Sequence, residues 1–124
     1  MWELTKSFTF EAAHTLRREI DREASRRIHG HYYKAEIAVS GRPDRGTGMI
    51  VDIGVLEQHL GGLRAQLDHQ FLDDIEDMGP ATMENIARWI WDRAVNVVPG
   101  LVRVTVLRES CGERCAYEGR AADA

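Results

Sequence analysis

A chain of 124 residues is long enough for one hydrophobic core and too short for two, so the sequence predicts a single domain over residues 1–124. The composition, 44% hydrophobic and 29% charged, is typical of a globular domain in water, and a formal net charge of -4 argues against a nucleic-acid partner. We find no apolar run long enough to span a bilayer, and the first segment alternates as a strand does rather than resembling a cleavable leader. We therefore expect a cytoplasmic protein with no membrane partner.

Two segments near the N-terminus alternate between apolar and polar side chains, as half-buried strands do. The first covers residues 2–14 and the second covers residues 30–41. Their apolar sets are Trp2, Leu4, Phe8 and Phe10 in the first and Tyr33, Ala35, Ile37 and Val39 in the second. Residues 15–28 lose the alternation and are rich in charge, which fits either a short amphipathic helix or a mobile loop. We expect the two strands to pair as a wide hairpin.

This hairpin brings histidines together. His29 and His31 are two positions apart, so on an extended segment they share a face, and His14 ends the partner strand. Gly30 between them removes bulk where the backbone passes close to a ligand. Three neutral imidazoles suit zinc, which keeps a fourth position open for water or substrate in catalytic sites. The sequence therefore predicts a zinc site, and the alternative is three ordinary half-exposed strand residues.

Two helical patterns follow the hairpin. The first begins at Asp52 and is weakened near its end by Gly61-Gly62. Its apolar stripe is Leu56, Leu60, Leu63 and Leu67. The second opens at Thr82, a suitable N-cap, and its apolar face is Met83, Ile86, Ala87, Ile90 and Ala94. Both helices are expected to cover one face of a sheet.

The C-terminal part alternates again over residues 101–109, and residues 115–119 are long enough for one more strand. The turn between them contains Cys111, and the tail 120–124 is expected to fray. The predicted order is therefore ββααββ, which places the chain in the α+β class.

Five stretches of the chain form a specific set of motifs. In chain order they are FTFEAAH (8–14), IHGH (28–31), LDHQFLDD (67–74), TMENIARWIWD (82–92) and RESCGERCAYEG (108–119). In this order and spacing they resemble the 6-pyruvoyl-tetrahydropterin synthase and 6-carboxytetrahydropterin synthase family. The resemblance implies the tunnelling fold, in which four-stranded antiparallel sheets with two helices on one face form a trimeric β-barrel and two trimers stack as a hexamer. Sheet edges that pair between subunits are consistent with such a ring.

The resemblance also implies roles for single residues. His14, His29 and His31 match the family's zinc ligands. Asp68 and His69 match its acid-base pair, in which the carboxylate orients the imidazole.

Three further residues match positions around the pterin ring. Glu109 matches the glutamate that anchors the pterin, since a carboxylate accepts two parallel N–H bonds from a 2-amino-pyrimidinone edge. Glu84 and Thr82 match positions near the same ring, and a helix cap with a first-turn acid explains them nearly as well.

One expected residue of this family is missing. The synthases carry a proton-transfer cysteine a few residues before HGH, and Ser25 occupies that place here. A serine hydroxyl is far less acidic than a thiol. A related subfamily uses a glutamate three residues before HGH, where this chain has Arg26. Glu23 and Asp21 are the competing candidates for a base.

Three functions follow from these residues. The first is a zinc-dependent enzyme acting on the C6 side chain of a dihydropterin such as dihydroneopterin triphosphate, with a place in tetrahydrobiopterin-like, 7-deazapurine or folate pathways. The second is a pterin-binding homologue that has lost the standard synthase activity because Ser25 replaces the cysteine. The third is an oligomeric scaffold with structural zinc.

Overall fold

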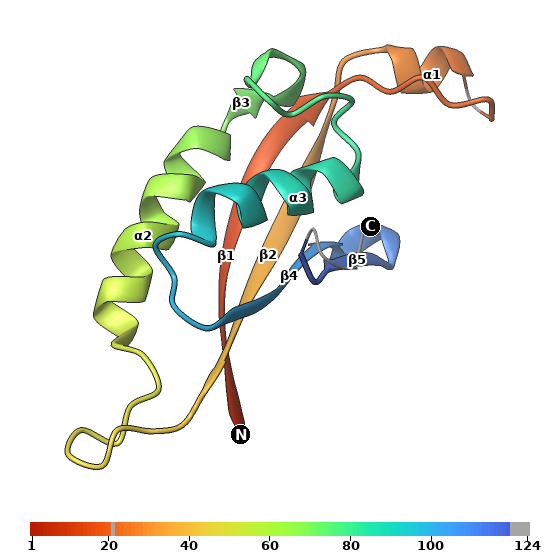
Figure 1. The fold of residues 1–124 in the computed structure, drawn as a ribbon. Coiled ribbons are helices and arrows are strands. Elements are labelled where there is room, and N and C mark those ends of the chain that lie inside the picture. Colours follow the sequence, from red (N-terminus) through yellow and green to blue (C-terminus); the bar gives the residue numbers. More distant parts are fainter. Residues whose placement is uncertain (21, 120–124) are drawn as a thin grey trace.

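The computed structural model describes residues 1–20 and 22–119, so the predictions for Asp21 and the tail 120–124 lie outside the described residues. The chain forms one curved sheet with two longer helices on one face and a short helix at one end (Figure 1). The elements are β1 (Trp2–His14), α1 (Arg22–Arg26), β2 (His29–Gly41), α2 (Ile53–Leu67), β3 (Gln70–Phe71), a 3-10 turn (Leu72–Asp74), α3 (Met83–Ala94), β4 (Leu101–Arg108), a second 3-10 turn (Glu109–Cys111) and β5 (Glu113–Tyr117).

The strands lie in the order β3-β1-β2-β4-β5. β1 and β2 pair antiparallel over their whole length, from Trp2 opposite Gly41 to His14 opposite His29. β4 pairs antiparallel with β2, and β5 with β4. The wide hairpin predicted from the alternation is therefore confirmed.

The prediction of four antiparallel strands is wrong in one respect, because β3 adds a fifth strand that runs parallel to β1 and makes the sheet mixed. β3 has two residues, Gln70 and Phe71, and a strand of this length leaves no alternation to detect. The charged segment 15–28 contains the short helix α1, which is the first of the two alternatives for that segment.

The core lies between the sheet and the two longer helices. The four predicted leucines of α2 are all buried, and its N-cap is Asp52, whose carboxylate accepts from the Gly54 amide. Thr82 caps α3 as predicted, since its hydroxyl accepts from the Asn85 amide at 3.1 Å. The sheet contributes alternate residues of β1 and β2, including Phe10 and Tyr33. Among the described residues, no helix is long and apolar enough to cross a membrane.

Substituting two glycines by alanine should change the stability of the fold in opposite directions. Gly100, before β4, has a φ of +79°, and a Cβ there would lie 2.5 Å from the Ser40 carbonyl oxygen. A left-handed L-residue costs about 1–2 kcal/mol before the clash is added, so we expect Gly100→Ala to destabilise the fold by at least this amount. Gly62, inside α2, has open space at its Cβ position, so Gly62→Ala should stabilise by about 0.5–1 kcal/mol.

Thermal and urea unfolding of both variants and wild type at one protein concentration measures these changes. A Gly100→Ala protein as stable as wild type would contradict the tight approach to Ser40.

Candidate functional site

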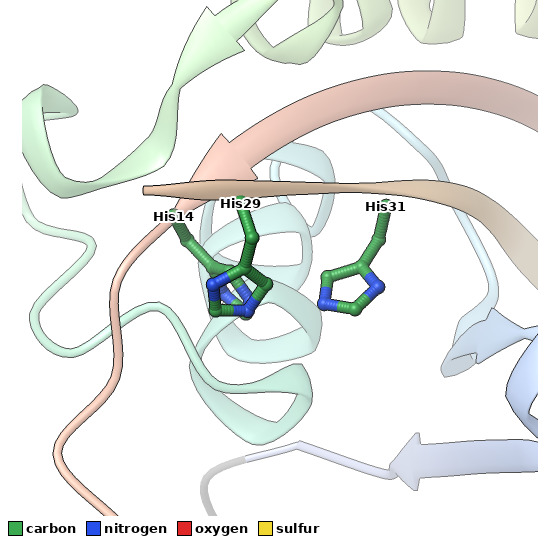
Figure 2. Close-up of side chains that lie close together, drawn as sticks. All are labelled: His14, His29 and His31. Carbon is green, nitrogen blue, oxygen red and sulfur yellow. The ribbon is translucent and has the colours of Figure 1, made fainter. Parts of the chain in front are cut away.

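Three histidines meet at the end of the β1–β2 pair (Figure 2). His14 ends β1, and its Cα partner His29 begins β2; His31 follows two positions later on the same face. The ring centroids lie 4.5 Å (His14–His29), 4.9 Å (His14–His31) and 5.0 Å (His29–His31) apart. One nitrogen from each ring can be chosen so that all three lie within 4.8 Å of one another. The predicted convergence of the three imidazoles is confirmed.

Backbone contacts orient two of these rings. His14 Nδ1 donates to the Ala81 carbonyl oxygen at 2.8 Å, and His29 Nδ1 donates to the Arg27 carbonyl oxygen at 2.8 Å. A ring that donates from Nδ1 presents an Nε2 lone pair when it is neutral. His14 is only 1% exposed, and its buried Nε2 has no hydrogen-bond partner among the described residues. This orphaned nitrogen and the donor set fit a metal ion.

Burial favours the uncharged form of the cluster. It lowers the pKa of His14, and it lowers the pKa of His31 to about 4, where the Arg108 guanidinium adds to the effect. Neutral imidazole is the form that binds metals, so the lowered pKa values favour the metal-binding form of these two rings. Tyr33 lies behind them on β2, and burial raises its pKa to about 12.

Arg108 and Glu113 lie beside the histidines, and neither was predicted as a site residue. Arg108 ends β4 and donates from Nη1 to His31 Nε2 at 3.1 Å, while its Nη2 lies 2.5 Å from Glu113 Oε1 at the start of β5. Both residues line the two cavities that flank the cluster. Charged residues at a strand end carry no spacing signal that would have indicated this role.

The first cavity, of about 580 Å³, contains the predicted residues Thr82 and Glu84 together with His14. This volume is in the range of small-molecule pockets. Asp73, which the sequence reasoning missed, also lines it and accepts from the Thr15 amide at 3.0 Å and from the Thr15 hydroxyl. Asp73 therefore fixes the chain just after His14.

The second cavity, of about 400 Å³, is lined by Ser25, His29 and His31, among others. Ser25 is 2% exposed, and its hydroxyl is already engaged: it donates to the Arg22 carbonyl at 3.0 Å and accepts from the Arg18 amide at 3.3 Å. These contacts hold α1 against the segment that leaves β1. Ser25 thus lies near the cluster, but its hydroxyl is engaged in hydrogen bonds that stabilise the segment between β1 and β2.

Asp68 and His69 lie away from both cavities. They follow α2, and His69 borders a different hollow, which Glu11, Tyr32 and His31 also line. Alternation puts Glu11 and Tyr32 on the sheet face that points away from the helices. His69 is 74% exposed and has a φ of 57°, an uncommon backbone conformation for a residue other than glycine. Within one chain, the predicted acid-base pair and the complete histidine cluster are therefore not brought together.

The carboxylate of Asp68 is held ionised. The Glu11 amide donates to its Oδ1 at 2.9 Å and lowers the pKa of Asp68, and Arg64 and His69 add to the effect. Glu109 begins the second 3-10 turn and is exposed. It is not among the described residues that line the two cavities. Glu23 is exposed on α1.

Known proteins are similar to this chain in sequence. A profile described as 6-pyruvoyl tetrahydropterin synthase matches residues 3–120. The 6-carboxy-5,6,7,8-tetrahydropterin synthase of Synechocystis sp. is 38% identical over 125 residues, which covers 94% of this chain and 93% of that protein. The dihydroneopterin monophosphate aldolase of Pyrococcus furiosus is 35% identical over 96 residues, which covers 77% of each.

A solved structure agrees at the level of the fold. The 6-pyruvoyl tetrahydropterin synthase of Caenorhabditis elegans superposes with a TM-score of 0.82 over 96% of both chains at 24% identity. Together, the sequence profile over nearly the whole chain and the relative at 38% identity show that this chain belongs to the 6-pyruvoyl tetrahydropterin synthase family.

Proposed function

We propose that the chain is a zinc-dependent enzyme that acts on the C6 side chain of a dihydropterin, with a dihydroneopterin triphosphate-like substrate. The observation that carries the proposal is the cluster of His14, His29 and His31, whose nitrogens converge beside two cavities. His14 Nε2 is buried and has no hydrogen-bond partner among the described residues, which would be costly in a scaffold without a ligand.

The names of relatives support a dihydropterin substrate. One relative is named as a tetrahydropterin synthase and another as an aldolase of dihydroneopterin monophosphate. Both names describe pterins with a substituted side chain, although the reactions differ. The reaction of this chain is therefore proposed as synthase or lyase chemistry at that side chain.

The histidine cluster would hold the zinc ion, which when bound supplies Lewis-acid polarisation of oxygens on the substrate side chain. Asp73 and the Ala81 carbonyl oxygen keep the β1 end of the cluster in place. Thr82 and Glu84 line the cavity beside His14 and are proposed to contact the pterin. Glu109 is proposed to anchor the 2-amino-pyrimidinone edge through its carboxylate.

The acid-base pair is proposed to act on a neighbouring copy. His69 is exposed on the sheet face opposite the cluster, so within one chain it cannot serve the cavities beside His14. Within the described residues, β3 and β5 form the two edges of the sheet, and such edges suit pairing between subunits. We propose a hexamer of two stacked trimers, in which Asp68 and His69 of one copy move the proton at the histidine cluster of another.

A second candidate is a pterin-binding homologue without synthase turnover. The observation that favours it is the Ser25 hydroxyl, which is buried and engaged by Arg22 and Arg18. A hydroxyl fixed in this way is a poor substitute for a proton-transfer thiol. Pterin binding and turnover would then separate.

The first prediction concerns zinc content. Replacing His14, His29 or His31 by Ala removes one of three imidazole ligands, so each variant should lose most of about one zinc per chain. Atomic absorption of the purified proteins measures this. His59→Ala is the matched control, since His59 lies on α2 outside the cluster and its loss should leave the zinc content unchanged. Equal zinc in all four variants and wild type would rule out the site.

The second prediction concerns assembly. If His69 of one copy serves the cluster of another, inactive His29→Ala and His69→Ala proteins should regain activity when co-expressed, because mixed oligomers contain some intact composite sites. Light scattering should give about six times the 14.0 kDa chain mass. Mixed oligomers as inactive as either parent, or a stable monomer, would contradict the composite site.

The third prediction concerns the missing thiol. One acid-base group contributes about 10²–10⁴-fold to a rate. If no other group supplies the proton relay in place of the thiol, wild type should therefore bind a pterin yet turn over dihydroneopterin triphosphate weakly or not at all. Ser25→Cys should recover part of the rate, and Glu23→Gln tests the competing carboxylate on α1. The assay uses both dihydroneopterin triphosphate and dihydroneopterin.

Glu109→Ala provides the binding control and should abolish neopterin binding in both backgrounds. Robust wild-type synthase activity that Ser25→Ala leaves unchanged would show that the proton relay lies elsewhere.

A further inference from the structure

The turn that carries Asp68 and His69 is fastened to the main chain of one residue, Glu11. The Glu11 amide donates to Asp68 Oδ1 at 2.9 Å, and the Glu11 carbonyl oxygen accepts from the His69 amide at 2.6 Å. Arg64 strengthens the same anchor, since it pairs with Asp68 Oδ2 at 3.1 Å and donates from Nε to the Thr9 carbonyl oxygen at 2.7 Å. These contacts hold His69 in its left-handed conformation.

The side chain of Glu11 adds a separate contact. Its Oε2 lies 3.4 Å from His69 Nε2, while Asp68 Oδ2 lies 3.7 Å from His69 Nδ1. The imidazole therefore has one carboxylate near each ring nitrogen. Both distances are within ion-pair range and longer than a tight hydrogen bond, so Nε2 can exchange Glu11 for an atom of a substrate.

We propose that Glu11 is a positioning residue that orients the His69 ring and directs Nε2 toward the reacting group. The proposal rests on the function proposed above, because it assumes that His69 moves a proton. The charged groups that face His69 are Glu11 from β1 and Asp68 from the end of α2, with Arg64 acting through Asp68. With Asp68 alone, the His69 ring is held only at Nδ1, and its Nε2 can swing away from the reacting group. The contact between Glu11 and Nε2 restricts that rotation.

A purely structural role explains the Glu11 carboxylate poorly. The side chain is 64% exposed, and exposed ion pairs contribute little to stability. The main-chain contacts to Asp68 and His69 are available to any non-proline residue at this position. Within the described part of the chain, the Glu11 carboxylate pairs with His69 alone. Its effect should therefore appear in catalysis and in the state of the ring rather than in folding.

The test compares Glu11→Gln with Glu3→Gln. Glu3 lies on the same strand and the same face, and it pairs with Arg103 at 2.7 Å, so it controls for the loss of one exposed charge. Partners that orient metal-ligating imidazoles are worth about 10–100-fold in affinity or activity. Taking the lower end for His69, we expect Glu11→Gln to lower kcat by about 10-fold with KM changed less than about twofold. Glu3→Gln should match wild type, Glu11→Asp should retain more activity than Glu11→Gln, and all melting temperatures should agree.

A second measurement reads the ring directly. Ring-nitrogen chemical shifts of ¹⁵N-histidine protein, with the His69 signals assigned through His69→Gln, report which nitrogen carries the proton and what it contacts. Glu11→Gln should move the His69 signals, whereas Glu3→Gln should not. Unchanged His69 signals would overturn the proposal whatever happens to kcat, and so would a kcat within about twofold of wild type in an enzyme that turns over.

The two levels of the proposal can fail separately. If wild type shows no turnover of any dihydropterin, the proposed function fails, and a shift of the His69 signals in Glu11→Gln still supports positioning of the ring. If Glu11→Gln unfolds, Glu11→Asp carries the same two measurements.

Discussion

The site depends on a single register between β1 and β2. His14 lies opposite His29, and Ala12 lies opposite His31. Because strand side chains alternate, a slip of one residue in β2 would turn both of its histidines to the other face and leave His14 alone in the core. The register is set by the apolar residues next in line, where Phe10 lies opposite Tyr33 with ring centroids 5.0 Å apart. The packing that stabilises the sheet therefore also assembles the histidine cluster.

The same burial prepares the cluster chemically. His14 lies at the edge of the core, where desolvation disfavours the charged imidazole and the Ala81 carbonyl oxygen fixes the hydrogen on Nδ1. That carbonyl precedes the N-cap Thr82, so the start of α3 determines the orientation of the His14 ring at the end of β1. The local signal for the Thr82 cap thus also places the Ala81 carbonyl oxygen, which contacts His14, 67 positions earlier in the chain.

Much of this arrangement could be predicted because it follows short periodicities. The two long strands, the leucine stripe of α2 and the shared face of His29 and His31 come from spacings of two or of three to four residues. The Thr82 cap comes from its residue type, and His14 joins the cluster through the predicted hairpin. β3 could not be predicted, because it exists only through pairing with β1. Arg108 and Glu113 could not be assigned to the site either, since their place beside His31 depends on the order β2-β4-β5 across the sheet. The exposure of His69 could not be predicted either, because it follows from a left-handed backbone conformation that the Glu11 carbonyl oxygen stabilises.

β1 serves the two proposed halves of the chemistry on its two faces. Its main chain at Glu11 anchors the turn of Asp68 and His69 on the outer face, and three residues later it ends in His14 on the core face. The histidine cluster and the proposed acid-base pair are thus rigidly related through one short stretch of strand, yet they point in opposite directions. In the proposed assembly, the distance across which a proton moves is then set by how two copies pack. A change at that interface would alter proton transfer while every residue of the histidine cluster stays in place.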